Sequence, residues 1–154
     1  MKAMARFART TAVLVVAASA LVAGTARADG PFSYYPLTPC RVADTRNAAG
    51  TYGGPILSAG VTRNFQVQGV CGVPVGAKAV SLNLTIVAPS AGSWLTVWPS
   101  GGTAPFVSAI NFAAGDPPTA NGAIVGLSAN AQDLSIKNAV GTVHVIVDVT
   151  GYFQ

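Results

Sequence analysis

Two tryptophans are the most distinctive candidates for ligand contact in this sequence. Trp94 and Trp98 are separated by Leu95, Thr96 and Val97. Alternate residues of a β-strand share a face, so Trp94, Thr96 and Trp98 are expected on one side, with the indoles about 13 Å apart. Exposed indoles so placed can stack on the sugar rings of a polysaccharide, which makes these three residues candidate ligand-binding residues. Aromatic rings also fill protein cores, and alternation alone leaves that second role open.

Asp44 and Arg46 place a carboxylate and a guanidinium close together. Two residues apart on a predicted strand, their side chains face the same side, and Asp148 lies on another predicted strand. Such a set can bind a sugar hydroxyl or a substrate carboxylate. In a chain with so few charges it more commonly ties strand ends to loops through paired hydrogen bonds. We therefore favour a structural role for Asp44, Arg46 and Asp148.

The residues that catalysis needs do not come together in this sequence. His144, the only histidine, is about 13 Å from Asp148 along one predicted strand, too far for the hydrogen bond of a catalytic triad. No Gly-x-Ser-x-Gly motif occurs, and five scattered aspartates offer no pair for glycoside hydrolysis. We predict no enzyme and no catalytic residue. No residue set predicts a metal, haem, flavin or nucleotide, so no cofactor is expected, and a calcium site among loop Asp and Asn residues stays undecided.

The elements that must position these groups show the two-residue period of β-strands. Within Val80–Val87 the apolar residues alternate with Ser81, Asn83 and Thr85, which is typical of a half-buried strand. Further strands are expected at Cys40–Arg46, Val61–Gln68, Ser93–Trp98, Val107–Phe112, Ala123–Ser128, Leu134–Asn138 and Val143–Thr150. Short strands separated by Gly- and Pro-rich turns predict an all-β fold. We expect one antiparallel two-sheet β-sandwich of jelly-roll or Greek-key type, with about eight strands.

Residues 1–28 have the layout of a secretory signal peptide. Lys2, Arg6 and Arg9 precede an apolar run from Ala12 to Gly24, and small residues follow for cleavage after Ala28. The apolar run, about 13 residues long, is too short for a membrane span, which needs roughly 20. We predict a signal peptide over 1–28 and a single β-sandwich domain over 29–154. The mature chain is then secreted or associated with the cell surface, with no membrane contact after cleavage.

Secretion would place Cys40 and Cys71, the only cysteines, in an oxidising compartment. The sequence has no Cys-x-x-Cys redox motif, and two cysteines with one distant histidine do not have the spacing of a zinc site. We therefore predict a structural disulfide between Cys40 and Cys71.

Charge excludes several partners. Only 9% of the 154 residues are charged, and removal of residues 1–28 leaves five basic and five acidic residues, hence no net charge. A chain without a basic cluster lacks the electrostatic attraction that drives binding to nucleic acid or to a membrane surface. The same neutrality removes repulsion between copies and permits a homo-oligomer.

The chain also resembles a known family. The segments that carry the resemblance are Pro39–Arg46, Gly72–Pro74, Ala79–Thr85, Leu95–Gly101, Asn111-Phe112, Ala120-Asn121 and Val147–Phe153. Together they are similar to a β-rich module found in secreted proteins of actinobacteria and other soil bacteria, where it occurs alone, in tandem or beside extracellular hydrolases. The resemblance covers nearly the whole of the mature chain and implies an extracellular β-rich domain, but no defined activity.

Two functions from different classes are consistent with the sequence. In the first, a non-catalytic module binds a cell-wall or extracellular polysaccharide through exposed aromatic rings. In the second, a structural protein of the cell surface or extracellular matrix associates with itself through sheet edges. Tyr34, Tyr35 and Tyr52 lie in loop-like segments and can either add to an aromatic surface or seal the ends of the sandwich.

Overall fold

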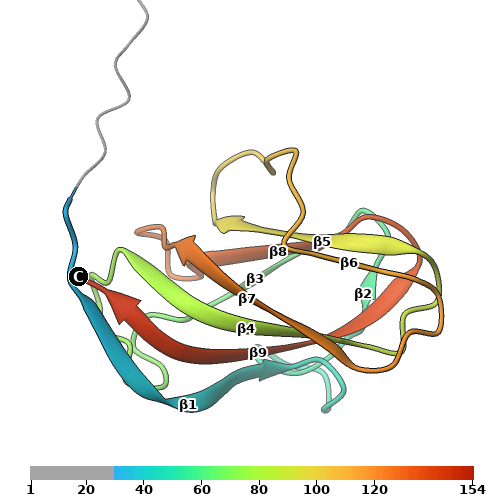
Figure 1. Ribbon diagram of the computed structural model, residues 1–154, viewed down its shortest axis with the longest axis horizontal. Helices are drawn as coiled ribbons and strands as arrows, with labels where there is room; N and C mark the ends of the chain where they lie inside the picture. Colours follow the sequence, from blue (N-terminus) through green and yellow to red (C-terminus); the bar gives the residue numbers. More distant parts are fainter. Residues whose placement is uncertain (1–29) are drawn as a thin grey trace, which may run out of the picture. The chain divides into compact units, whose positions relative to one another are not determined.

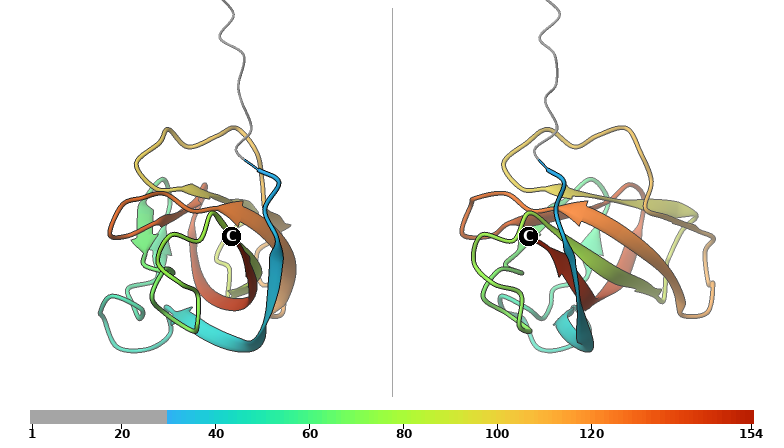
Figure 2. Two further views of the ribbon diagram at one scale, coloured as in Figure 1. Left: turned by 90° about the vertical axis from the view of Figure 1, so that its left-hand side faces the viewer. Right: turned by 60° about the vertical axis from the view of Figure 1, so that its left-hand side comes forward.

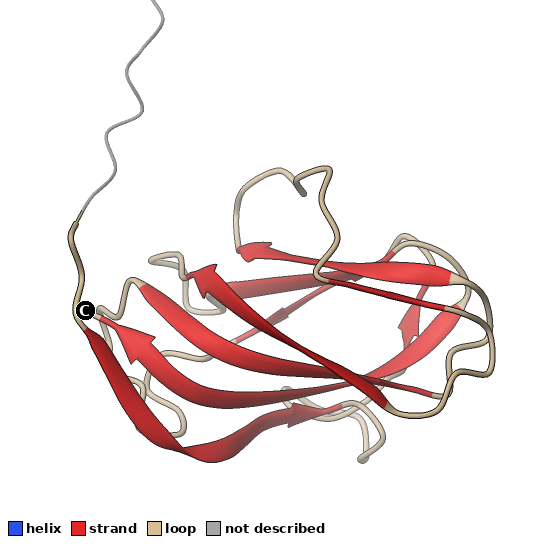
Figure 3. Cartoon of the chain, in the orientation of Figure 1, coloured by secondary structure: helices blue, strands red, loops and turns tan. Residues whose placement is uncertain are grey.

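A computed structural model describes residues 30–154, and the predicted signal peptide, residues 1–28, lies outside this range. The described residues form nine strands and no helix (Figures 1 and 3). The strands are β1 (Tyr34–Asp44), β2 (Leu57–Ser58), β3 (Thr62–Phe65), β4 (Ala79–Val87), β5 (Ser93–Pro99), β6 (Ile110–Phe112), β7 (Thr119–Gly126), β8 (Leu134–Asn138) and β9 (Thr142–Phe153). Consequently, no helix in this part of the chain is long and apolar enough to cross a membrane.

The strands form two antiparallel sheets. The first sheet has the order β1-β9-β4-β7, and β2 pairs with the beginning of β9. The second sheet has the order β3-β8-β5-β6. Figure 1 shows β9 between β1 and β4, and Figure 2 shows the domain turned so that the side with the C-terminus comes toward the viewer. The predicted antiparallel β-sandwich is confirmed, with nine strands where about eight were expected.

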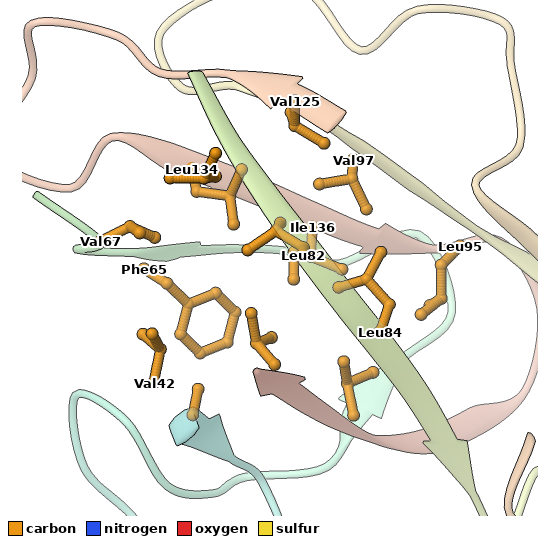
Figure 4. Packing of buried hydrophobic residues seen from close by; sticks show 14 of the residues in the cluster. Val42, Phe65, Val67, Leu82, Leu84, Leu95, Val97, Val125, Leu134 and Ile136 are labelled. Atoms are coloured by element: carbon orange, nitrogen blue, oxygen red, sulfur yellow. The ribbon is translucent and has the colours of Figure 1, made fainter. Parts of the chain in front are cut away.

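The core lies between the two sheets and follows from the alternation of residues along the strands. On β4 the side chains of Val80, Leu82, Leu84 and Ile86 are buried, whereas those between them face outward and are only half-buried. Leu95 and Val97 of β5 and Leu134 and Ile136 of β8 cover them from the second sheet. Figure 4 shows these side chains meeting between the layers. The strand pattern read from the sequence is therefore confirmed where it matters most for folding.

The beginning of β1 departs from the expectation. Tyr34 and Tyr35 were expected in a loop, but they belong to β1 and pair with Phe153 and Tyr152 of β9. The pairing slips between Pro36 and Cys40, as expected where prolines, which lack an N–H donor, enter an edge strand. The sequence pattern did not predict this part of β1, because prolines are unfavourable in strands and the pairing with β9, which stabilises the strand, is a long-range contact.

The predicted disulfide is present. It joins Cys40 of β1 to Cys71 in the connection between β3 and β4, with the two Cα atoms 5.7 Å apart. A second tie between distant segments comes from Asp133, whose carboxylate accepts hydrogen bonds from the backbone N–H groups of Val67 and Gln68, each at 2.8 Å. These contacts hold the long connection between β3 and β4 against both sheets.

Candidate functional site

The two tryptophans lie on the outer face of the second sheet. Leu95 and Val97 point into the core, and Trp94, Thr96 and Trp98 occupy the alternate positions of β5. The sequence therefore predicted correctly that these three residues share a face, and the structure adds that this face points away from the core.

The connection between β5 and β6 changes what this face can bind. Residues 100–109 rise above the second sheet (Figure 1) and fold back onto it. The Thr96 hydroxyl donates to the Val107 carbonyl at 2.8 Å, and the Trp98 indole N–H donates to the Gly102 carbonyl at 3.1 Å. Trp98 is consequently only 6% exposed, whereas Trp94 is 39% exposed. The sequence left the exposure of the two indoles open, and the structure distinguishes them: the connection covers Trp98, and only Trp94 is available to a ligand.

Trp94 stands between two hollows, which together we call the Trp94 groove. One hollow, of about 270 Å³, is lined by Trp94, Pro105, Phe106, Val107, Ser108 and Asn111. The other, of about 340 Å³, shares Trp94, Pro105 and Phe106 and adds Thr96, Lys137 and Val140 among its walls. Phe106 is fully exposed at the rim. Phe106 could not be recognised from the sequence, because a single aromatic residue in a Gly- and Pro-rich connection carries no periodic signal.

Polar groups flank the aromatic rings of the groove. Asn111 lies directly opposite Trp94 in the pairing of β5 with β6, and its amide donates to the Ser108 hydroxyl at 3.1 Å. Lys137 lies opposite Thr96 in the pairing of β5 with β8. An apolar ring bordered by an amide, a hydroxyl and an ammonium group can contact a ligand that has both C–H and O–H faces.

The charged residues form a separate cluster on the first sheet. The Arg46 guanidinium donates to both Asp44 carboxylate oxygens, at 2.8 and 2.6 Å, so the predicted pair is present. Asp148 pairs instead with Arg41, whose guanidinium donates to its two oxygens at 2.8 and 3.3 Å. Arg41 also approaches Asp44 at 3.5 Å. Arg41 could not be recognised from the sequence, because the pairing of β1 with β9, which brings Arg41 opposite Asp148, cannot be read from spacing.

These ion pairs shift the protonation of their members. The hydrogen bonds from Arg46 lower the pKa of Asp44 to about 2, against the opposing effect of burial. The partner carboxylates raise the pKa of Arg41 and of Arg46. All three groups therefore keep their charges at neutral pH, as expected for a cluster that ties a strand end to the turn after it.

His144 takes no part in an acid–base pair with Asp148. Its Nδ1 lies 3.0 Å from the Thr45 carbonyl oxygen and 3.2 Å from the Thr45 hydroxyl. Within residues 30–154, no three or more His, Cys, Asp or Glu side chains lie close enough together to hold a metal ion.

No protein-family model and no curated protein matches this chain.

Proposed function

We propose that this protein is a secreted, non-catalytic β-sandwich module that binds a cell-wall or extracellular polysaccharide in the Trp94 groove. The observation that carries the proposal is the exposed Trp94 indole between two hollows that Phe106 and Pro105 wall on one side. No cofactor is part of the proposal.

The chemistry of the groove suits a neutral sugar chain. The C–H face of a pyranose ring packs on an aromatic ring, which contributes about 0.5–1.5 kcal/mol beyond the area it buries if it behaves as an aromatic pair does. Its hydroxyl groups can reach the Asn111 amide, the Ser108 hydroxyl and the Lys137 ammonium group that line the hollows. Since the groove contains a single charged residue, a polyanion such as nucleic acid would gain little electrostatic attraction there.

The carboxylates of the described domain support a non-catalytic role. Asp44 and Asp148 accept from arginines, Asp133 accepts from two backbone N–H groups, and Asp116 accepts from the Ala113 N–H at 2.7 Å. Each of these four side chains is engaged in holding its own chain together, and none of them lines the Trp94 groove.

Secretion is the part of the proposal that rests on the leader sequence. The disulfide between Cys40 and Cys71 supports it, because such bonds persist mainly in oxidising compartments. The resemblance to extracellular bacterial modules points the same way. Expression of the full chain in a bacterial host, followed by mass measurement of the protein in the medium, tests for cleavage after Ala28.

Sedimentation with insoluble polymers tests the binding role. The protein recovered from the medium is spun alone and with chitin, cellulose or purified peptidoglycan, in parallel with Trp94→Ala and the control Val75→Ala. Val75 is an exposed loop residue outside the groove. We expect wild type and Val75→Ala to pellet with at least one polymer and Trp94→Ala to bind about tenfold more weakly. Equal binding by Trp94→Ala would refute the role of the groove.

The same groove provides one observation in favour of self-association. Phe106 is fully exposed beside the hollows, and Val107 and Val140 are about half-exposed on their walls, so a second copy could bury this apolar surface. In that case the protein would sediment as a dimer or larger species without polymer, and Phe106→Ser would return it to a monomer. A wild-type monomer at high concentration would reject this alternative.

A further inference from the structure

The outer face of the first sheet has a hollow of its own, separate from the Trp94 groove, that the proposed function does not use. Its volume is about 630 Å³, and it is lined by Pro39, Cys40, Arg41, Asn83, Asp148 and Thr150. Because the first and second sheets pack face to face, this hollow on the outside of the first sheet and the Trp94 groove on the outside of the second lie on opposite sides of the sandwich.

Three neighbouring strands bring the polar groups of this hollow together. Arg41 of β1 and Asn83 of β4 both lie opposite Asp148 of β9. The Arg41 guanidinium fixes the Asp148 carboxylate through two hydrogen bonds. A carboxylate has about four acceptor positions, so two guanidinium bonds leave positions for the hydroxyl groups of a ligand.

The Asn83 side chain does not help to hold the described domain together through hydrogen bonds. It is half-buried in the hollow, and within residues 30–154 its amide forms no hydrogen bond to protein, in contrast to the buried Asn138, whose amide is fully engaged. An amide can donate and accept at once. Asn83 therefore presents both functions to whatever enters the hollow.

An aromatic ring lies beside these polar groups. The Tyr34 ring covers Gly151 so closely that a Cβ atom at residue 151 would overlap it. Tyr34 is nevertheless 47% exposed, it packs against Phe153 at 5.1 Å between ring centroids, and its hydroxyl donates to the carbonyl of Thr150, a wall of the hollow, at 3.3 Å. The glycine thus lets the ring lie on the sheet with part of its surface open to solvent.

We propose that this hollow, together with Tyr34, is a second carbohydrate-binding site that takes a neutral oligosaccharide. Sugar hydroxyls bind to Asp148, Asn83 and Arg41, and an adjoining sugar ring packs on Tyr34. The nearby charges support a neutral ligand, because Arg41 and Arg46 are balanced by Asp44 and Asp148. The Tyr34 ring lies over Gly151, which pairs with Ser81, and Ser81 is two residues from Asn83 on β4, about 7 Å, so the aromatic ring and the polar groups adjoin each other.

This inference takes its ligand class from the proposed function but rests on different residues. If both sites are occupied, one protein molecule binds a polysaccharide chain on each of two opposite faces and so cross-links separate polysaccharide chains. Binding and structural roles, which the sequence left as alternatives, then become one activity.

Binding isotherms on insoluble chitin, cellulose and peptidoglycan test the second site. Asn83→Ala removes hydrogen bonds to the ligand and none within the described domain, so we expect about a tenfold rise in the apparent Kd. Gly151→Ala moves the Tyr34 ring without deleting it and should also weaken binding. Asn47→Ala is the matched control, because the exposed Asn47 side chain likewise forms no hydrogen bond in the described domain but lies outside the hollow. Urea unfolding of each variant establishes that it is folded.

The outcomes separate the two proposals. Wild-type binding by Asn83→Ala overturns the second site, and the Trp94 groove is then judged by Trp94→Ala alone. Weakened binding by Asn83→Ala with unchanged binding by Trp94→Ala supports the second site and rejects the first. If the wild-type protein binds none of the three polymers, both proposals are rejected.

Discussion

Asp133→Asn provides the sharpest test of how this fold is held together. The Asp133 side chain is 1% exposed, and each of its oxygens accepts a backbone N–H at 2.8 Å, from Val67 and from Gln68. Asparagine has nearly the same shape, but only one of its two terminal atoms accepts a hydrogen bond. The other becomes an NH₂ group that faces a backbone N–H, so one buried donor loses its partner.

The magnitude follows from these two bonds. A hydrogen bond to a charged group contributes about 1.5–3 kcal/mol, and an unsatisfied buried donor costs about 1–3 kcal/mol. One bond is weakened to a neutral one and the other is lost, so we expect Asp133→Asn to lower the free energy of unfolding by about 3 kcal/mol. With an m-value of about 1.5 kcal/mol/M in urea, the midpoint should fall by roughly 2 M.

Equilibrium urea unfolding at pH 7, followed by tryptophan fluorescence, measures this loss. Asp116→Asn is the matched control, because Asp116 accepts a single exposed N–H, that of Ala113. The control should lower the free energy of unfolding by less than about 1 kcal/mol, since water can replace the lost partner. If the two variants shift the midpoint equally, the reasoning about the buried carboxylate is wrong.

Two further predictions concern covalent and ionic ties. Replacement of both Cys40 and Cys71 by serine should lower the free energy of unfolding by about 3–4 kcal/mol, because the bond closes a loop with a sequence separation of 31; thermal unfolding of this variant beside the oxidised wild type checks it, and an unchanged midpoint would contradict it. Asp44 has a folded-state pKa of about 2, below its ordinary value of 3.8, so the stability it contributes is complete above about pH 4 and is lost as the pH falls toward 2. Urea midpoints between pH 5 and 2 should therefore fall less steeply for Asp44→Asn than for wild type, and parallel curves would refute the assignment.

Local patterns predicted the parts of this fold that local sequence determines. The alternation along Val80–Val87 correctly gave a strand with one buried face, and the alternation along β5 correctly put Trp94 and Trp98 on one face. Neither pattern predicts how the residues that connect two strands will fold. Trp98 is buried where residues 100–109 fold over it and the Gly102 carbonyl accepts from its indole N–H. No periodic signal in that Gly- and Pro-rich stretch predicts where it folds.

Long-range pairing explains the other differences. Arg41 meets Asp148 because β1 pairs with β9 across more than a hundred residues of sequence, and the same pairing makes a strand of the segment that holds Tyr34. The disulfide was predictable because two cysteines allow only one pairing. The closeness of Asn83 and Tyr34 on one sheet face could not be predicted, because it follows from the order of the strands in the sheet, which alternation does not specify.

The central place of β9 in the first sheet also determines when the molecule can fold. This strand pairs with β1, β2 and β4, so β1 and β2 have no partner strand until residues 142–153 have been made. Such non-local topologies fold slowly, because distant segments must meet before their contacts compensate for the lost chain entropy. A growing chain can pair β4 with β7 as soon as residue 126 has been made, but the first sheet is completed only by β9.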